Sequence, residues 1–364
     1  MMSAPGQLQQ LTGIRAVAFL MVFFSHAGFP GFFLWSGVDL FFVLSGFLIT
    51  GILLSQDRRT GYFRVFYARR FLRIFPPFYV ILLLSILVLR DVSKWQVTSI
   101  ALFYTNLYMP LADSTSVSPS YWALSPYWSL ALEEQFYLLW PLLVFTLSPK
   151  QVLKACLVLV AVAPLLRGLT YLYLFLPQHA SYEAIRLLPW NRLDLLAAGG
   201  AIATCRHLNL FKPETMARCG LLLCGTSAAI IVLGVFLSPD FRYTGHSLLF
   251  STLGLTAICG LMAGIIMYLA YAAGGPIIKI LSYAPVVYLG TISYTMYLLH
   301  GTVLVVLQQN FGMQSGWLFM ACAFTVILLL AALSWHWLEL PAKRLKDSPW
   351  FMRKVRLQPQ IAKS

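Results

Sequence analysis

The chain has 364 residues, of which 59% are hydrophobic and only 10% are charged. Soluble globular domains average about 45–50% apolar and about 25% charged residues, so this composition excludes an ordinary soluble enzyme, a disordered chain and a disulfide scaffold. A mean hydropathy of +0.77 is typical of a protein with several membrane spans. The net charge of +14 would fit nucleic acid in a soluble protein, so its distribution along the chain has to be considered first.

Long apolar runs predict the architecture. A bilayer span needs about 20 mostly apolar residues. Such runs occur ten times, at residues 12–28, 38–55, 74–90, 128–148, 152–176, 191–205, 220–237, 246–271, 285–308 and 316–340. The sequence therefore predicts an all-α polytopic membrane protein with about ten transmembrane helices. The first run is not expected to be a cleaved signal, because it carries Arg15 and His26 and has no small-residue cleavage site.

The remaining segments are assigned from their length and composition. The apolar stretch 95–109 is too short to span comfortably and is expected to be a half-inserted or interfacial segment on one side of the membrane. Residues 110–127 form a Ser/Pro-rich loop on the same side. We expect one transmembrane domain over 1–340 and a basic tail over 341–364. The cysteines are scattered without a CxxC pattern, so they predict membrane packing in place of a metal site or a disulfide: Cys156, Cys205, Cys219, Cys224, Cys259 and Cys322.

Lysines and arginines set the orientation, because cytoplasmic loops carry an excess of both. With the first residues inside, the ten predicted spans place twenty of the 26 basic residues on the cytoplasmic side and six outside. Both termini are therefore predicted to be cytoplasmic. This distribution also explains the net charge, so no nucleic-acid partner is expected.

Ionisable residues inside a span are candidates for a functional site, because they are costly to bury in lipid. Arg15 and His26 lie eleven residues apart in the first span, and 1,100° of helical rotation places both on one face. About 16 Å of helix separates them. Arg15 is expected near the cytoplasmic surface and His26 near the outer end. Each could be a surface or interfacial residue by itself, but together they favour a shared polar path.

Carboxylates are predicted at the same outer level. Asp39 begins the second span, where Ser45 and Gly46 would allow close approach of a helix or a ligand. Glu133 lies about one turn into the fourth span, and its neighbour Glu134 is expected to point elsewhere.

Other polar residues have simpler interpretations. Arg192 and Asp194 are expected to pair at the outer end of the sixth span. His300 is interpreted as a packed histidine between helices. Glu339, at the inner end of the last span, is expected to bond a basic residue such as Lys343.

A cluster of six arginines precedes the third span, within DRRTGYFRVFYARRFLRIFPPFY. The cluster fits a cytoplasmic loop by its charge alone. Its exclusive use of arginine, with aromatic residues in between, also favours phosphate binding and base stacking. An arginine cluster inside and a histidine with carboxylates outside suit a donor whose anionic head stays in the cytosol while a thin arm carries the reactive group. Coenzyme A thioesters have this shape.

The motifs resemble those of the acyltransferase 3 family of integral membrane acyltransferases, over nearly the whole chain. The ordered set carries the resemblance: Arg15 and His26 with ten residues between them, GVDLFFVLSGFLI at 37–49, RRFLRIFP at 69–76, WSLALEEQFYLLWP at 128–141, RLDLLAAG at 192–199, ISYTMYLLH at 292–300 and LELP at 338–341. The family implies transfer of an acyl group, most often acetyl, from cytosolic acyl-CoA. The resemblance also implies that the acceptor is a hydroxyl of an envelope glycan or lipid-linked molecule at the outer face, and therefore a location in a bacterial inner membrane.

The resemblance also implies residue roles. His26 would be the catalytic base or a transient acyl carrier, and Glu133 would belong to the outer reaction chamber. Arg15 would help to hold the donor. Arg70 and Arg73 would contact its phosphates, with the adjacent Arg69 in the same motif. We add Asp39 as an expected orienter of His26. No metal is expected. Some relatives carry an additional outer hydrolase-like domain, so the membrane domain or a partner protein is expected to complete the transfer here.

The chemistry leaves two routes open. An imidazole with a pKa near 6.5 can activate a hydroxyl for direct attack on the thioester, or it can carry the acyl group itself. A transporter is the alternative function, but the chain shows no internal repeat of the kind common in transporters. A non-catalytic scaffold would not need Arg15 and His26 on one face.

Overall fold

The computed structural model describes residues 8–31, 33–58, 61–89, 91–111, 119–177, 183–238, 241, 247–313, 316–346, 348 and 351. Every regular element within these ranges is a helix. The predicted all-α fold is therefore confirmed. The basic tail over 341–364 falls largely outside the described residues, as do residues 112–118 of the expected loop over 110–127. The second half of that expected loop instead forms the short helix α6 (Pro119–Leu124).

Each of the ten predicted spans coincides with a long helix. These helices are α1 (Gln9–His26), α2 (Gly37–Ser55), α3 (Tyr62–Val88), α7 (Tyr127–Thr146), α8 (Pro149–Thr170), α10 (Leu193–His207), α11 (Pro213–Leu237), α13 (Leu255–Tyr271), α15 (Ala284–Phe311) and α16 (Trp317–Ser334). Short π-helical turns extend three of them: η4 (Tyr171–Phe175) after α8, η6 (Phe250–Gly254) before α13 and η7 (Trp335–Glu339) after α16. By length and composition, seven of the described helices can cross a membrane. The other three are α1 and α7, which carry ionisable residues of the site, and the 15-residue α10.

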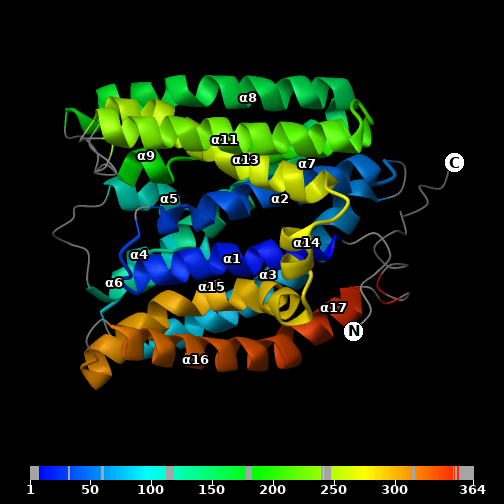
Figure 1. Ribbon diagram of the computed structural model, residues 1–364. Helices are drawn as coiled ribbons and strands as arrows, with labels where there is room; N and C mark the ends of the chain where they lie inside the picture. Colours follow the sequence, from blue (N-terminus) through cyan, green and yellow to red (C-terminus); the bar gives the residue numbers. More distant parts are fainter. Residues whose placement is uncertain are drawn as a thin grey trace, which may run out of the picture.

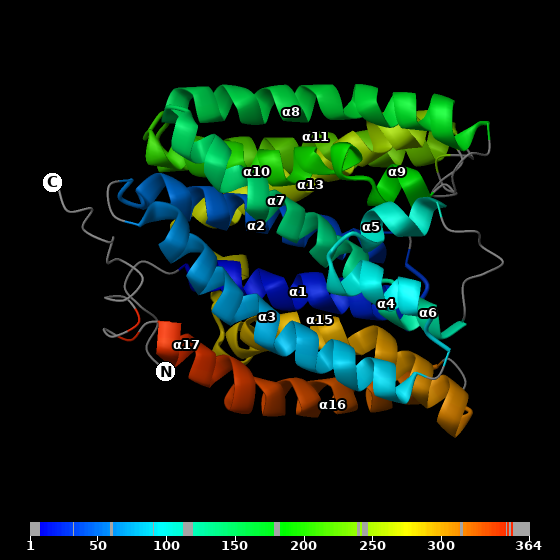
Figure 2. The same ribbon diagram turned by 180° about the vertical axis from the view of Figure 1, so that it is seen from behind.

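The long helices run along one common direction, with the short helices at their ends (Figures 1 and 2). One end carries α4 (Lys94–Ala101), α5 (Thr105–Tyr108), α6 (Pro119–Leu124) and α9 (Glu183–Leu187), and α1 ends there at His26; we call it the His26 end. The opposite end carries α14 (Pro276–Leu281) and α17 (Leu340–Lys346), and we call it the α17 end. The stretch 95–109 forms short helices and no span, as its length predicts.

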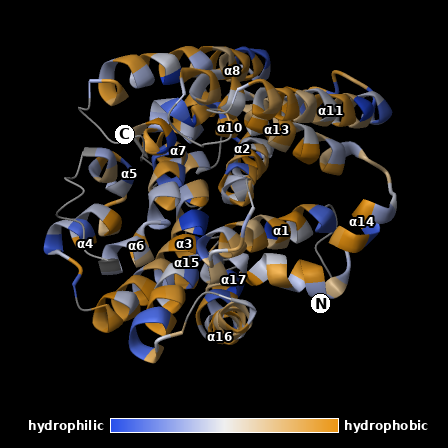
Figure 3. Ribbon diagram, turned by 60° about the vertical axis from the view of Figure 1, so that its left-hand side comes forward, coloured by the Kyte–Doolittle hydropathy of each residue, from blue (hydrophilic) through white to orange (hydrophobic). Residues whose placement is uncertain are grey.

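The outward faces of the outer helices are apolar. Figure 3 shows hydrophobic residues along α8 and α11. Only 17% of the apolar window of α11 and 22% of that of α8 is buried within the protein. Large side chains such as Leu222 and Phe236 are exposed there. Because exposing such faces to water would be costly, they fit contact with lipid chains.

Two glycines position the helices that build the site. A Cβ atom on Gly290 of α15 would lie 1.9 Å from the carbonyl oxygen of Thr12 in α1. A Cβ atom on Gly46 of α2 would lie 1.9 Å from the carbonyl oxygen of Leu196 in α10. Only glycine permits these backbones to come so close, as in other tightly packed membrane helices. The predicted close approach at Gly46 is confirmed.

Candidate active site

A polar cavity of ≈ 70 Å³ lies among α1, α2, α3, α7 and α15. Its lining combines three arginines, two glutamates and several hydroxyl groups: Arg15, Arg70, Arg73, Glu133, Glu134, Ser45, Ser129, Ser293, Tyr137, Tyr294 and Tyr297. Pockets that hold drug-sized ligands measure about 300–1,000 Å³, so this cavity suits a small group and not a whole nucleotide. Figure 2 shows α1, α3, α7 and α15 converging in the centre of the bundle.

A hydrogen-bonded carboxylate forms one wall of the cavity. The Ser45 hydroxyl donates to Glu133 Oε1 over 2.9 Å, and the Tyr137 hydroxyl donates to Oε2 over 3.1 Å. The two hydroxyl oxygens are 2.8 Å apart. Ser45 comes from α2, whereas Glu133 and Tyr137 lie one turn apart on α7. The carboxylate is therefore held in one orientation by two helices.

Three of the four predicted donor-binding arginines reach the cavity. Arg15 Nε donates to Ser293 Oγ over 3.3 Å, which ties α1 to α15. The Arg70 guanidinium lies over the Tyr137 ring, 4.3 Å from its centroid. Arg73 lies one turn further along α3 and also lines the cavity. Arg69 has an exposed side chain and is not among the lining residues.

The glutamates and arginines share this single cavity, which corrects the expected separation of an outer carboxylate from an inner arginine cluster. The physical reason is how far each residue lies from the end of its helix. Arg73 lies eleven residues into α3, or about 16 Å from its start at the α17 end, and Glu133 lies six residues into α7 from the other end. Both therefore reach the middle of the bundle. Glu134, which was expected to point elsewhere, lines the same cavity.

A larger cavity of ≈ 590 Å³ borders the first one and shares Arg70, Glu134 and Tyr137 with it. Its other lining residues are mainly aromatic and aliphatic side chains of α3 and α7, such as Phe71 and Leu138, which are both exposed. Among the described residues Arg70 is the only cation that lines this groove, so the described part of the chain offers no second cationic ligand for a phosphate there.

His26 lies at the opposite level from the arginines, as predicted. It is the last residue of α1, its side chain is exposed, and its Nδ1 is 2.9 Å from the carbonyl oxygen of Val22. A carbonyl oxygen only accepts hydrogen bonds, so Nδ1 carries the hydrogen and the neutral ring keeps its lone pair on Nε2. Nothing in this arrangement needs Asp39 to orient the ring. The expected role of Asp39 as the orienter of His26 does not fit this geometry.

Two aromatic residues connect His26 to the cavity. The rings of His26 and His300 are 5.1 Å apart between centroids, and the rings of His300 and Tyr297 are 5.2 Å apart. Tyr297 lines the cavity, where its hydroxyl lies 2.7 Å from Ser129 Oγ and donates to the carbonyl oxygen of Pro126. A continuous row of polar side chains therefore leads from the arginines toward His26.

Sequence reasoning did not assign Ser293 or Tyr297 to the site, and it interpreted His300 only as a packing residue. A signal was present in the sequence. Residues 293, 297 and 300 have the i, i+4, i+7 spacing of one helix face, and all three are polar within an otherwise apolar span. Glu339 also differs from its prediction, because its carboxylate accepts from Thr295 Oγ1 over 2.6 Å. Lys343 instead lies over the Trp335 ring.

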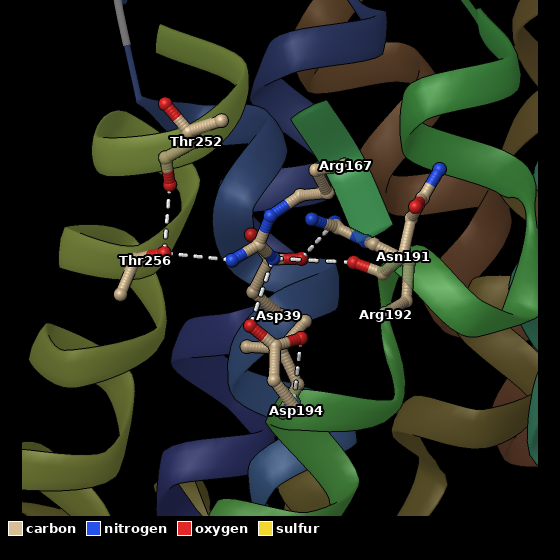
Figure 4. Close-up of polar contacts among 8 residues, drawn as sticks. Asp39, Arg167, Asn191, Arg192, Asp194, Thr252 and Thr256 are labelled. Atoms are coloured by element: carbon tan, nitrogen blue, oxygen red, sulfur yellow. Dashed lines mark hydrogen bonds and ion pairs between the residues drawn. The ribbon is translucent and has the colours of Figure 1, made fainter. Parts of the chain in front are cut away.

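Asp39 belongs to a separate buried cluster at the His26 end, between α2, α8, α10 and α13 (Figure 4). It is paired with Arg192, and Arg167 is paired with Asp194 at 2.8 Å. These four side chains are at most 1% exposed. Further bonds come from the Asn191 carbonyl oxygen and the Thr256 hydroxyl, which both accept from Arg167.

This arrangement corrects the expected pair of Arg192 with Asp194. Arg192 is the residue before α10 and Asp194 is the second residue of that helix, and residues two positions apart at a helix start do not face each other. Arg192 therefore turns to α2 and Asp194 to α8. The close approach of α2 and α10 at Gly46 brings Asp39 to Arg192.

Removing one member of the buried pair Asp39–Arg192 is expected to lower the stability of the protein strongly. Replacing Asp39 by alanine leaves the Arg192 guanidinium buried without its partner, and such changes cost about 3–5 kcal/mol. Replacing both Asp39 and Arg192 by leucine should restore most of this loss, because no unpaired charge remains. The measurement is thermal unfolding in detergent, with the exposed Glu214→Ala as the control. An Asp39→Ala variant that keeps full stability but loses activity would indicate a role in the reaction instead.

Comparison with known proteins identifies the family of this chain. A family model for the acyltransferase domain of the acyltransferase 3 family matches residues 8–336, which is most of the chain. The chain belongs to the acyltransferase 3 family. The matched range includes Arg15 and His26 on α1, Arg70 and Arg73 on α3, and Glu133 on α7.

Several O-acetyltransferases are similar to this chain, and two of them match 92% of it. The peptidoglycan O-acetyltransferase OatA of Listeria monocytogenes is 30% identical over 362 residues, covering 92% of this chain and 55% of the relative. The putative peptidoglycan O-acetyltransferase YrhL of Bacillus subtilis is 30% identical over 92% of this chain and 54% of the relative. A putative O-acetyltransferase of Staphylococcus aureus is 35% identical over 38% of this chain and 24% of the relative. The chain thus spans about half the length of the first two, and no solved structure matches it.

Proposed function

We propose that this protein is a membrane O-acetyltransferase that moves an acetyl group from cytosolic acetyl-CoA to a hydroxyl of an envelope glycan on the outer face. The observation that carries the proposal is the path from Arg15, Arg70 and Arg73 through the central cavity toward His26. The family membership supports the reaction class. Acetyl is favoured over a longer acyl group because the cavity measures only ≈ 70 Å³.

The proposed topology has ten crossings, with both termini on the cytoplasmic side of a bacterial inner membrane. Its support is the distribution of basic residues, twenty inside against six outside. The α17 end is then cytoplasmic and the His26 end faces outward. The transmembrane domain covers 1–340 in this proposal, and the basic segment 341–364 stays inside.

The donor enters from the α17 end. Arginines present several donors in a planar fork that matches phosphate oxygens, so Arg70 and Arg73 are the proposed ligands of the coenzyme A phosphates. Arg15 is fixed by Ser293 and lies next to the acyl-bearing arm. The nucleotide remains outside the small cavity, and the arm carries the thioester inward. No metal is needed for this step.

His26 acts on the acceptor. Its Nε2 lone pair takes the proton of the acceptor hydroxyl while the hydroxyl oxygen attacks the thioester carbonyl carbon. The new carbon–oxygen bond forms, the carbon–sulfur bond breaks, and coenzyme A leaves as the thiolate. The hydrogen bond from Nδ1 to Val22 supports this role, because it keeps the lone pair on the nitrogen that needs it. The half-buried Glu133 contributes to the cavity that receives the donor arm.

The acceptor class is proposed from the relatives. Two of them carry peptidoglycan in their names, so a cell-wall glycan is the first acceptor to test. An envelope partner protein that completes the transfer to the polymer belongs to the same proposal.

The test compares cells that lack the gene with cells that carry it back as wild type or as His26→Asn. Mass spectrometry of the purified envelope glycans should find base-labile acetyl groups only with the wild-type gene. Isotope-labelled acetate supplied to the cells should appear in these groups. Unchanged acetylation after deletion would contradict the proposed acceptor, and acetylation that survives His26→Asn would contradict the proposed chemistry.

A further inference from the structure

A second histidine lies directly behind His26. His300, on α15, is completely buried. Its ring is 5.1 Å from that of His26 and 5.2 Å from that of Tyr297, and the edge of Phe19 packs against it with centroids 6.2 Å apart. A buried histidine in a membrane helix is costly unless its polar atoms are used.

Only one of the two ring nitrogens of His300 is used by the protein. Nδ1 is 2.5 Å from the carbonyl oxygen of Tyr297, so it carries the hydrogen and donates it. Nε2 therefore bears a lone pair, and this buried atom has no hydrogen-bond partner among the described residues. Buried polar atoms without a partner are uncommon, and a catalytic role is one of the explanations for them. His26 and His300 thus have the same tautomer, with the hydrogen on Nδ1 and the lone pair on Nε2.

The position of His300 separates its role from that of His26. His26 is exposed at the end of α1, where an acceptor from outside meets it first. His300 lies between His26 and Tyr297, and Tyr297 lines the cavity that the donor arm enters. The spacing of the two imidazole rings is within reach of a small side-chain rotation or of one bridging water molecule.

We propose that His300 relays the proton from His26 to the sulfur of the departing coenzyme A, which rests on the proposed acetyl transfer. The acceptor hydroxyl gives its proton to His26 Nε2 as its oxygen bonds to the acyl carbon. His26 passes this proton to His300 Nε2. The thiolate released by cleavage of the carbon–sulfur bond takes it to become the thiol, and both imidazoles return to their neutral forms. The nitrogen of His300 that is bonded to Tyr297 takes no part.

The first variant is His300→Asn. An asparagine amide can keep the hydrogen bond that Nδ1 donates to the Tyr297 carbonyl, but it has no basic nitrogen at the position of Nε2. Turnover of purified protein should fall about 10²-fold or more, as for the loss of a proton-transfer group. Binding of acetyl-CoA and the melting temperature should stay unchanged. Phe19→Leu is the matched control, because it disturbs packing on the same ring without removing a base, and it should keep most of the turnover.

A second measurement separates proton relay from packing. His300→Ala leaves a space of ring size next to the exposed His26. Added imidazole should restore turnover in this variant, whereas pyrrole, which has the same shape without a basic nitrogen, should not. Equal rescue by both compounds, or normal turnover of His300→Asn, would overturn the relay. If His26→Asn also kept its activity, the proposed function itself would fail. If His26→Asn lost its turnover while His300→Asn kept normal turnover, only the relay would be refuted.

Discussion

Replacement of His26 by alanine is expected to lower acetyl transfer by at least about 10²–10⁴-fold, the usual contribution of a positioned general base. The protein should still fold, because the side chain lies at the exposed end of α1 and its one hydrogen bond is to the carbonyl oxygen of Val22 in the same helix. The measurement is acetyl transfer by purified protein, together with the melting temperature. Acetyl-CoA should bind as in the wild type, since His26 is not among the residues that line the donor cavity.

The matched control is His207→Ala. His207 is also exposed, but it lies in the last turn of α10 at the other end of the bundle. It should keep normal activity. His26→Asn gives a second comparison, because it can retain the bond to Val22 and lacks only the basic nitrogen. Near-normal transfer by either His26 variant would remove this histidine from the reaction.

Loss of Arg70 or Arg73 is expected to weaken acetyl-CoA binding strongly. A hydrogen bond to a charged group contributes about 1.5–3 kcal/mol, which corresponds to roughly ten- to more than a hundred-fold in affinity. Both side chains line the central cavity, so Arg70→Ala and Arg73→Ala should each show this loss in a titration with acetyl-CoA. Arg73→Lys should recover only part of the affinity, because lysine keeps the charge but not the planar fork.

The control comes from the same helix and the same motif. Arg69 neighbours Arg70 in the chain but is exposed and absent from the cavity lining, so Arg69→Ala should lose little affinity. Arg218, at the same end of the bundle on α11, tests the removal of an unrelated positive charge. Equal small losses at all four positions would mean that the arginines serve only as a diffuse topological signal.

Local sequence patterns predicted most of the individual helices and the placement of several site residues on them. The apolar runs located all ten long helices, and the eleven-residue spacing placed Arg15 and His26 on one face of α1. The arginine cluster was expected to precede the third helix, but α3 already begins at Tyr62, so four of the six arginines lie inside the helix. These features depend on residues close together in the chain, where helical geometry alone relates them.

The partners of these residues could not be predicted in the same way. Asp39 pairs with Arg192 across 153 positions, and Arg15 bonds Ser293 across 278. Such contacts depend on which helices pack side by side. Glycine indicated that close approach was possible at position 46, but it did not indicate the neighbouring helix. The expected pair of Arg192 with Asp194 was wrong because nearness in sequence was taken as nearness in space.

The sequence by itself determined that this chain is a helical membrane protein with an arginine-rich end, a histidine on the opposite side and the ordered motifs of its family. Hydropathy and charge decide these properties residue by residue, because lipid and water select for them locally. Only the tertiary structure decided that Glu133 shares a cavity with the arginines and that His300 lies behind His26. In a bilayer the outward side chains are as apolar as the lipid, so helix partners are chosen by close packing and buried polar contacts, which no local pattern specifies.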